Sequence, residues 1–292
     1  MYRSLLFLLL LVASCASDRR EDIPDEVFNP PVLISTPDSE KELFVWDFSS
    51  PRTYVYEVAN KTMTTISSAK ETSFNLDLGM EMVQEVEVQT TGNHEAEFVT
   101  MSIEIKEISG MPGMESLLQN SMDDELPKSM GRIQADGTIV NEAAVGGMLF
   151  YLPERDLKPG ERDTINSTIS LIDSMDINLN MEQRKVISFV GYEEYEGRNC
   201  AVLVINELSE GGDLQVEAED VEINAEINMA SGSRYYFDVE RHYFIGAEII
   251  TDGAMDDFDL SGLGGDSEEE MSMDVDVRTI QNIKLVAIKA NE

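Results

Sequence analysis

The chain has 292 residues, a formal net charge of −36, and 57 acidic against 21 basic side chains. This balance excludes a nucleic-acid partner, because phosphate backbones are held by Lys and Arg side chains that displace counterions. It also disfavours peripheral binding to anionic lipid head groups, so membrane attachment requires another mechanism. Two interpretations of the acidity remain, a hydrated surface suited to a salty habitat and the binding of divalent cations.

Residues 1–14 have the features of an export signal. Arg3 supplies a positive charge, residues 5–12 form an apolar run, and Val12-Ala13-Ser14-Cys15 follows. The run is much shorter than the ~20 apolar residues of a spanning helix. This segment resembles the lipobox of bacterial lipoproteins, which implies that Cys15 is the lipid attachment site and carries acyl chains such as palmitate. An ordinary signal peptide followed by an incidental cysteine is the alternative.

Residues 15–45 are acidic and contain prolines at positions 24, 30, 31 and 37. Low apolar periodicity with this proline content predicts an extended tether. Ala16 stands where Asp would resemble the inner-membrane retention signal of some Gram-negative lipoproteins. We therefore expect a lipid-anchored protein of the bacterial cell envelope, with the outer membrane favoured. The remaining residues, 46–292, are expected to form a β-rich domain.

From Thr53 onwards the dominant pattern has a period of two. Residues 74–82 alternate apolar Phe, Leu and Met with polar residues, which predicts a strand with one dry and one wet face. So long a strand should bend, and Gly79 is the expected place for a kink or bulge. Thr91-Gly92-Asn93 predicts a turn, and residues 99–105 predict the return strand of a hairpin.

One segment has helical spacing instead. Its apolar positions are Met114, Leu117, Leu118, Met122 and Leu126, and Pro127 ends the periodic run. This helix either completes the core against the sheet or offers a recognition surface. A turn-rich connection at residues 150–162 then separates two halves of similar size, which either share one sheet or form two domains.

The second half repeats the alternation, with apolar runs near residues 186–191, 200–205, 221–229, 235–239, 245–249, 271–277 and 283–288. Many strands and one helix predict a mainly β protein, α+β at the margin. The expected architecture is a curved antiparallel sheet or half-barrel of about ten strands with one main helix.

A family likeness rests on several short motifs along the mature chain. The tether, hairpin and helix are followed by Asp136-Gly137, by Leu152-Pro153 with Pro159-Gly160-Glu161, and by the stretch Gly-Ser-Arg-Tyr-Tyr-Phe-Asp at residues 232–238. This order resembles an uncharacterised family of β-rich bacterial lipoproteins and, more distantly, periplasmic half-barrel carriers of lipoproteins and lipids. The connection often ends in Gly-Asp-x-Trp in that family, and Gly160-Glu161-Arg162-Asp163 lacks the Trp. The resemblance implies no catalytic residues.

Motifs for catalysis and cofactors are absent from the sequence. His94 and His242 are the only histidines, and no nucleophile elbow, zinc-protease motif, P-loop or dinucleotide fingerprint occurs. Cys200 lies in a continuous apolar run and is expected to be a structural thiol. We therefore expect no cofactor and no enzymatic activity, with a hydrolase using unrecognised carboxylates as the minor alternative.

One acidic stretch has the spacing of a calcium-binding loop. Asp257, Asp259, Ser261, Gly262 and Glu268 stand at the loop positions that supply oxygen ligands and a sharp turn. Leu260 interrupts the polar half of the loop, and the flanks are predicted strands where such a loop has helices. A solvated loop is the favoured interpretation, so no metal ligand is assigned.

The chain has 16 methionines, several on predicted dry faces: Met80, Met82, Met101, Met229, Met271 and Met273. Thioethers either fill irregular gaps in a core or line a surface for varied apolar ligands. The favoured function is a non-enzymatic binding or scaffold domain that meets the membrane through its acyl chains and contacts envelope proteins. The alternative is a carrier of a hydrophobic ligand, a lipid or a lipoprotein acyl chain, in a Met-lined cavity.

Overall fold

The computed structural model describes residues 41–68, 75–90, 92–110, 128–138, 150–172, 177–218, 221–259 and 272–290. Regular structure in these residues is entirely β, which confirms the mainly β class. None of their segments is a helix long and apolar enough to span a membrane. The strands are β1 (Arg52–Ser68), β2 (Asn75–Thr90), β3 (Glu95–Ser109), β4 (Lys128–Gln134), β5 (Arg162–Ile172), β6 (Ile177–Tyr195), β7 (Arg198–Ala218), β8 (Val221–Asp238), β9 (Tyr243–Asp259) and β10 (Ser272–Ala290).

All ten strands belong to one antiparallel sheet in the order β4-β3-β2-β1-β10-β9-β8-β7-β6-β5. Consecutive strands pair with each other except β4 and β5, and the pairing of β1 with β10 joins the first strand to the last. Both halves of the sequence therefore contribute to a single sheet. Among the described residues no ladder joins the edge strands β4 and β5, so the sheet is open there.

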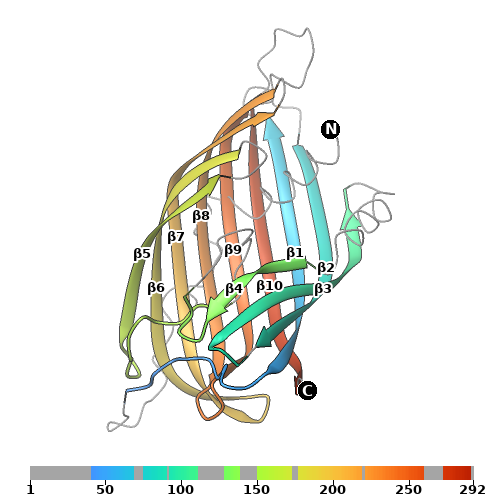
Figure 1. Cartoon of the computed structure of the whole chain (residues 1–292). Coiled ribbons are helices and arrows are strands. Elements are labelled where there is room, and N and C mark those ends of the chain that lie inside the picture. Colours follow the sequence, from blue (N-terminus) through green and yellow to red (C-terminus); the bar gives the residue numbers. More distant parts are fainter. Residues whose placement is uncertain are drawn as a thin grey trace.

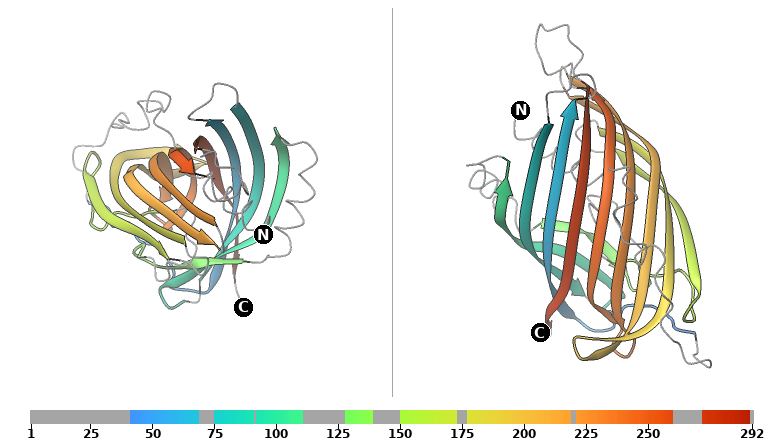
Figure 2. Two further views of the ribbon diagram at one scale, coloured as in Figure 1. Left: turned by 90° about the horizontal axis from the view of Figure 1, so that it is seen from above. Right: turned by 180° about the vertical axis from the view of Figure 1, so that it is seen from behind.

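The sheet is long and strongly curved, with one concave face (Figures 1 and 2). Strand β7 has 21 residues and is about 70 Å long at ~3.3 Å per residue. Register shifts mark bulges along the ladders, such as those near Val55 in β1 and between Phe189 and Gly191 in β6. Bulges increase local twist and let strands of this length curl.

The predicted bulge at Gly79 was wrong in position. The β1–β2 ladder runs through Gly79 without a shift, and the irregularities of the β2–β3 ladder lie at Glu81/Met82 and Glu85/Val86. The reason is that the extra residues belong to β3, not to β2. A Cβ at Gly79 would stand 2.5 Å from the Ser109 hydroxyl, so a larger residue there requires that side chain to move.

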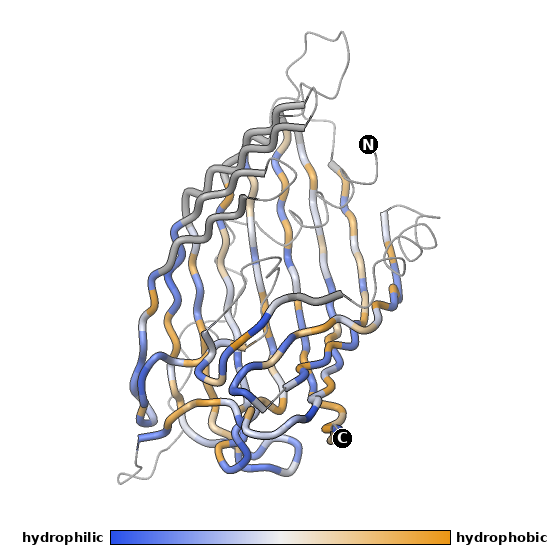
Figure 3. The backbone as a smooth tube through the Cα atoms, viewed as in Figure 1, coloured by the Kyte–Doolittle hydropathy of each residue, from blue (hydrophilic) through white to orange (hydrophobic). Residues whose placement is uncertain are grey.

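Period-two alternation builds the strands as predicted, and Figure 3 shows it as alternating apolar and polar positions. In β1, Tyr54, Tyr56 and Val58 face the core at 0% exposure, whereas Glu57 and Lys61 are exposed. The predicted turn after β2 is confirmed, since β2 ends at Thr90 and β3 begins at Glu95.

A segment of residues 41–48, here called the strap, crosses one end of the sheet before β1 (Figure 1). Its Glu42 forms an isolated antiparallel bridge with Leu157, and the Trp46 amide donates to the Ala135 carbonyl at 2.7 Å. Phe44, at the end of the predicted tether, is 2% exposed and packs in the core. The rest of the tether and the predicted helix at residues 114–126 lie outside the described residues.

Candidate functional site

The concave face of the sheet is sealed most completely at one end. Eleven aromatic side chains from the strap, the strands and residue 150 pack there, and we call this group the aromatic core. Its members are Phe44, Trp46, Phe48, Tyr54, Tyr56, Phe98, Phe150, Phe189, Tyr235, Phe237 and Phe244. Phe150 stacks on Phe244 with ring centroids 4.7 Å apart, and the Tyr56 hydroxyl donates to the Phe244 carbonyl at 2.9 Å. This end is a sealed interior.

Farther along the same strands, one group of inward side chains is apolar and only partly buried, whereas Ile227, Met255 and Val275 on the same face are buried. We call this group the upper wall, and β1, β2, β3, β8 and β10 contribute to it. Its members are Ile66, Leu76, Leu78, Met80, Met82, Ile103, Ile105, Met229 and Met273. Register pairs such as Ile66 with Leu76 and Asn60 with Met82 show that these positions continue the face of the core. The predicted dry-face positions Met80, Met82, Met229 and Met273 therefore lie on the concave face.

Met101 was placed wrongly by the alternation. It is 36% exposed, because one register shift of the β2–β3 ladder falls between Thr100 and Ser102 and turns it off the inner face. Met271 lies outside the described residues.

Where the aromatic core gives way to the upper wall, the inward positions of six adjacent strands are polar, and Met80 of β2 continues their row opposite Thr62. Directly opposed residues share a face of a sheet, so the row can be followed across six strands. This polar row consists of Lys185, Glu207, Ser231, Thr251, Thr279 and Thr62, on β6, β7, β8, β9, β10 and β1. It is inward because Ser231 and Thr62 lie four residues from Tyr235 and Val58, which are in the core.

Hydrogen bonds link members of the polar row in pairs. The Thr251 hydroxyl donates to Ser231 at 3.3 Å, and the hydroxyls of Thr62 and Thr279 are also 3.3 Å apart. One position nearer the core, Gln281 donates to Asn60 at 2.7 Å. The row is therefore a ladder of side-chain dipoles, not a set of isolated polar groups.

The charged end of the polar row is a buried ion pair. The Lys185 ammonium lies 3.7 Å from the Glu207 carboxylate and 3.4 Å from the centre of the Tyr151 ring, and Gln183 donates to Glu207. Burial lowers the pKa of Lys185 and raises the pKa of Glu207, while each charge partly offsets the shift of the other. With side-chain exposures of 8% and 13%, neither charge is well hydrated, so each depends on its partner.

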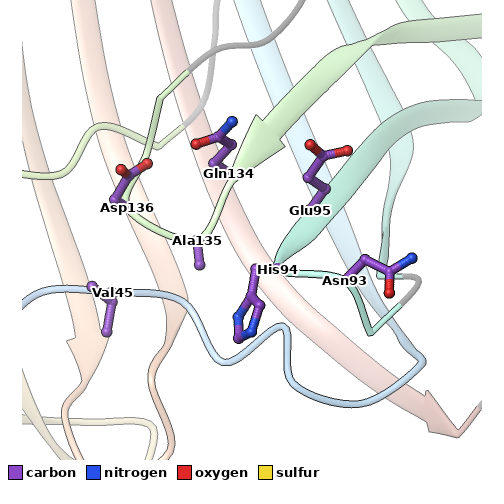
Figure 4. A pocket seen from close by; sticks show the side chains of 7 residues that line it. All are labelled: Val45, Asn93, His94, Glu95, Gln134, Ala135 and Asp136. Atoms are coloured by element: carbon purple, nitrogen blue, oxygen red, sulfur yellow. The ribbon is translucent and has the colours of Figure 1, made fainter.

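A separate depression of about 380 Å³ lies on the surface between the β2–β3 turn and the end of β4 (Figure 4). It is lined by Val45, Asn93, His94, Glu95, Gln134, Ala135 and Asp136. The His94 ring points away from the carboxylate of Glu95 in this view. The groups therefore do not converge on one point, and the depression lacks the geometry of a catalytic dyad.

The structure also locates the other residues singled out by the sequence. Cys200 is a free, fully buried thiol, and burial raises its pKa to about 11, which makes it a structural cysteine. Asp257 and Asp259 lie in the last residues of β9, and the rest of the proposed calcium loop is outside the described residues. Within the described ranges no three His, Cys, Asp or Glu side chains form a metal-binding group. Cys15 lies outside these ranges.

Sequence reasoning missed Lys185 and Glu207, although a signal was present. Lys185 lies at the same period-two positions as Ile187 and Phe189. Glu207 likewise shares its face with Leu203 and Ile205, so both charges fall on the dry face of their strands. A charge on the apolar face of an alternating strand indicates a buried partner. The partner itself is set by the register of β6 on β7.

Neither a family model nor a curated protein sequence matches this chain. Solved structures show weak likenesses. Lipovitellin, in a structure concerned with lipid–protein interactions, aligns over 84% of this chain at 10% identity and a TM-score of 0.44, and this chain spans 26% of it. Neisserial surface protein A aligns over 80% of this chain and 99% of its own at 8% identity and a TM-score of 0.22.

A LolA-superfamily protein from Nitrosomonas europaea aligns over 85% of this chain and 89% of its own, at 9% identity and a TM-score of 0.14. All three TM-scores lie below 0.5, so these likenesses carry no conclusion about this chain.

Proposed function

We propose that this protein is a lipid-anchored protein of the bacterial cell envelope whose β domain binds an amphiphile with an acyl chain on the concave face of its sheet. The observation that carries this proposal is the change along the inner face from a sealed aromatic core to a half-buried upper wall. Of the functions considered, the carrier of a hydrophobic ligand fits this change better than a scaffold does.

The upper wall has the chemistry that an acyl chain needs. Apolar area removed from water stabilises a complex by roughly 25 cal/mol per Å². Met80, Met82 and Met229 are half-buried thioethers, which adapt their rotamers to partners of varied shape. Leu76 and Leu78 contribute branched apolar side chains to the same wall. A chain of methylenes lying against these side chains would complete their burial.

The proposal includes no reaction. Glu207, the buried carboxylate of the polar row, is engaged by Lys185 and Gln183. The imidazole of His94 and the carboxylate of Glu95 point apart. Neither carboxylate is paired with a base or a nucleophile in the way that hydrolysis requires.

The anchor is assigned to Cys15, with the part of the predicted tether that precedes the strap joining it to the β domain. Cells fed an alkyne-tagged palmitate should label the wild-type protein, and Cys15→Ser should abolish the label. Cys200→Ser is the matched control and should keep it, because Cys200 is buried in the sheet. Equal labelling of the Cys15→Ser and wild-type proteins would contradict the anchor.

Ligand binding is tested by organic extraction of the purified full-length protein and mass spectrometry of the extract. We expect about one amphiphile per chain beyond the covalent acyl groups. Met80→Gln places an amide on the upper wall and should reduce this yield. Met63→Gln, on the opposite face of β1 where Met63 is 39% exposed, should leave it unchanged. An extract without stoichiometric amphiphile would favour the scaffold function instead.

A further inference from the structure

We propose that the polar row binds the head group of the ligand, and that this head is uncharged and carries hydroxyl and ester oxygens, as in a monoacylglycerol. The inference rests on the proposed function and specifies its ligand class. Three observations carry it: the position of the row, its charge balance and its hydrogen-bonding capacity.

The position of the row matches the layout of an amphiphile. An inner face that only packs against carbon needs Val, Ile and Leu at its inward positions, as at Ile187, Ile205 and Ile283. The polar row interrupts this pattern on six adjacent strands, Met80 of β2 stands level with it opposite Thr62, and Leu78 and Leu76 lie beyond it. A ligand with its head on the row would therefore lay its acyl chain along Met80, Leu78 and Leu76, which follow at every second residue of β2.

The charge balance of the row selects against an ionised head. Lys185 and Glu207 are its only charged members, and they form a pair with each other, so the row is neutral overall. A carboxylate head would approach Glu207 in a poorly hydrated site, where like charges repel strongly. The net charge of −36 on the whole chain adds to this repulsion. An uncharged head meets neither penalty.

The hydroxyls of the row retain hydrogen-bonding capacity after bonding to one another. Each Ser or Thr hydroxyl has one donor and two acceptor sites. The Thr62–Thr279 pair uses one donor and one acceptor, so one O–H of the pair and several lone pairs remain for a ligand. The Ser231–Thr251 pair has the same capacity. The vicinal hydroxyls of a monoacylglycerol can donate to the remaining lone pairs, and its ester carbonyl can accept from the remaining O–H. A simple ester supplies acceptors alone.

A competition experiment tests the head-group assignment on the full-length acylated protein. Native mass spectrometry is recorded with an equimolar mixture of 1-lauroylglycerol, laurate and methyl laurate, which share one acyl chain. The wild-type protein should carry the lauroylglycerol adduct in about tenfold excess over each of the others, the ratio expected when one or two net hydrogen bonds differ.

Thr62→Val with Thr279→Val removes two hydroxyls while conserving shape. This double variant should lose most of the preference for lauroylglycerol and keep its binding of methyl laurate. Thr65→Val is the matched control, because Thr65 lies on the outer face of β1, where its hydroxyl donates to Asp77 at 2.9 Å. Its adduct ratio should equal that of the wild type.

Each remaining outcome overturns the inference in an identifiable way. Equal adducts of all three compounds, or a preference for laurate, would leave the proposed function standing and remove the head-group assignment. A double variant that keeps the wild-type adduct ratio would show that the polar row does not discriminate between head groups. The absence of every adduct would refute the proposed function together with the inference.

Discussion

The two ends of the concave face differ although the same strands build both. At the aromatic core, inward positions carry rings that meet the strap and Phe150, and their exposure falls to a few per cent or less. Along the upper wall, the alternation is equally regular, but the side chains are Met, Leu and Ile and stay half-buried. Period-two spacing therefore determines which face is dry, whereas side-chain volume and a covering segment determine whether that face is sealed.

The boundary between the two ends is chemical as well as steric. The polar row places side-chain hydrogen bonds and one ion pair where a continuous core would place carbon. Buried polar groups are tolerated when they are paired, and all six members of the row have a partner in the row. The row thus lies where a region that stabilises the fold passes into a region that is proposed to bind a ligand.

The largest expected effect comes from truncating the aromatic core. Phe150→Ala removes a ring whose centroid lies 4.7 Å from that of Phe244 and 4.9 Å from that of Tyr56. This change should lower the free energy of unfolding by about 4 kcal/mol. Met80→Ala on the upper wall should cost only about 1 kcal/mol, because the side chain is only partly buried in the folded state. Urea denaturation measures both, and equal losses would remove the distinction between the two ends.

The next effect in size concerns the ion pair at the boundary. Lys185→Met leaves the Glu207 carboxylate buried without its cation and should cost about 3 kcal/mol. Adding Glu207→Leu removes the stranded charge, so the double variant should recover most of that loss in the same urea titration. If the double variant instead lost the sum of the losses of Lys185→Met and Glu207→Leu, the two charges would not depend on each other.

A smaller effect is expected from pH on the outer face beside the core. Burial alone would raise the pKa of Glu87, but hydrogen bonds from Lys289 at 2.9 Å and Gln89 at 2.8 Å outweigh it and lower that pKa below the ordinary value of 4.5. The unfolded chain then binds the proton more tightly than the folded protein. This contribution to stability is present above pH 4.5 and is lost as pH falls through the lowered pKa.

Thermal unfolding recorded across this pH range checks the assignment. Glu87→Gln should flatten the acid limb of the melting temperature against pH. Glu81→Gln, which removes the exposed partner of Lys61, should leave the limb unchanged, because surface ion pairs contribute little. Identical curves for Glu87→Gln and the wild type would contradict the assignment.

The smallest effect is expected from calcium. If residues 257–268 are a solvated loop, millimolar calcium should raise the melting temperature only slightly, and magnesium should do the same. Asp257→Ala with Glu268→Ala should then change nothing. A calcium-selective rise that the double variant loses would instead identify a metal site by mass action on the folded state.

Much of the fold could be predicted because alternation is local. Residues 74–82 and 221–229 identify their strands and their dry faces without any partner, and the run around Cys200 identifies a buried strand. The pairing of β1 with β10 could not be read in the same way, because it joins residues more than two hundred positions apart. Local patterns contain no information on such a contact.

The candidate site was predictable only in part for the same reason. Met80, Met82, Met229 and Met273 lie on the face that alternation assigned to them. The polar row could not be recognised, since Ser231, Thr251 and Thr279 are ordinary strand residues until the register aligns them. Met101 was misplaced because a bulge reverses the alternation without a sequence signal.

The most direct test of the account asks which end of the concave face touches the acyl chain. Trp46 is the only tryptophan and lies in the aromatic core at 2% exposure. Leu78→Trp in a Trp46→Phe background moves that reporter to the upper wall. A monoacylglycerol with a brominated acyl chain, which quenches tryptophan fluorescence only on contact, should quench the Trp at position 78 and spare the wild-type Trp46. Quenching of Trp46 to the same extent, or of neither protein, would contradict the account.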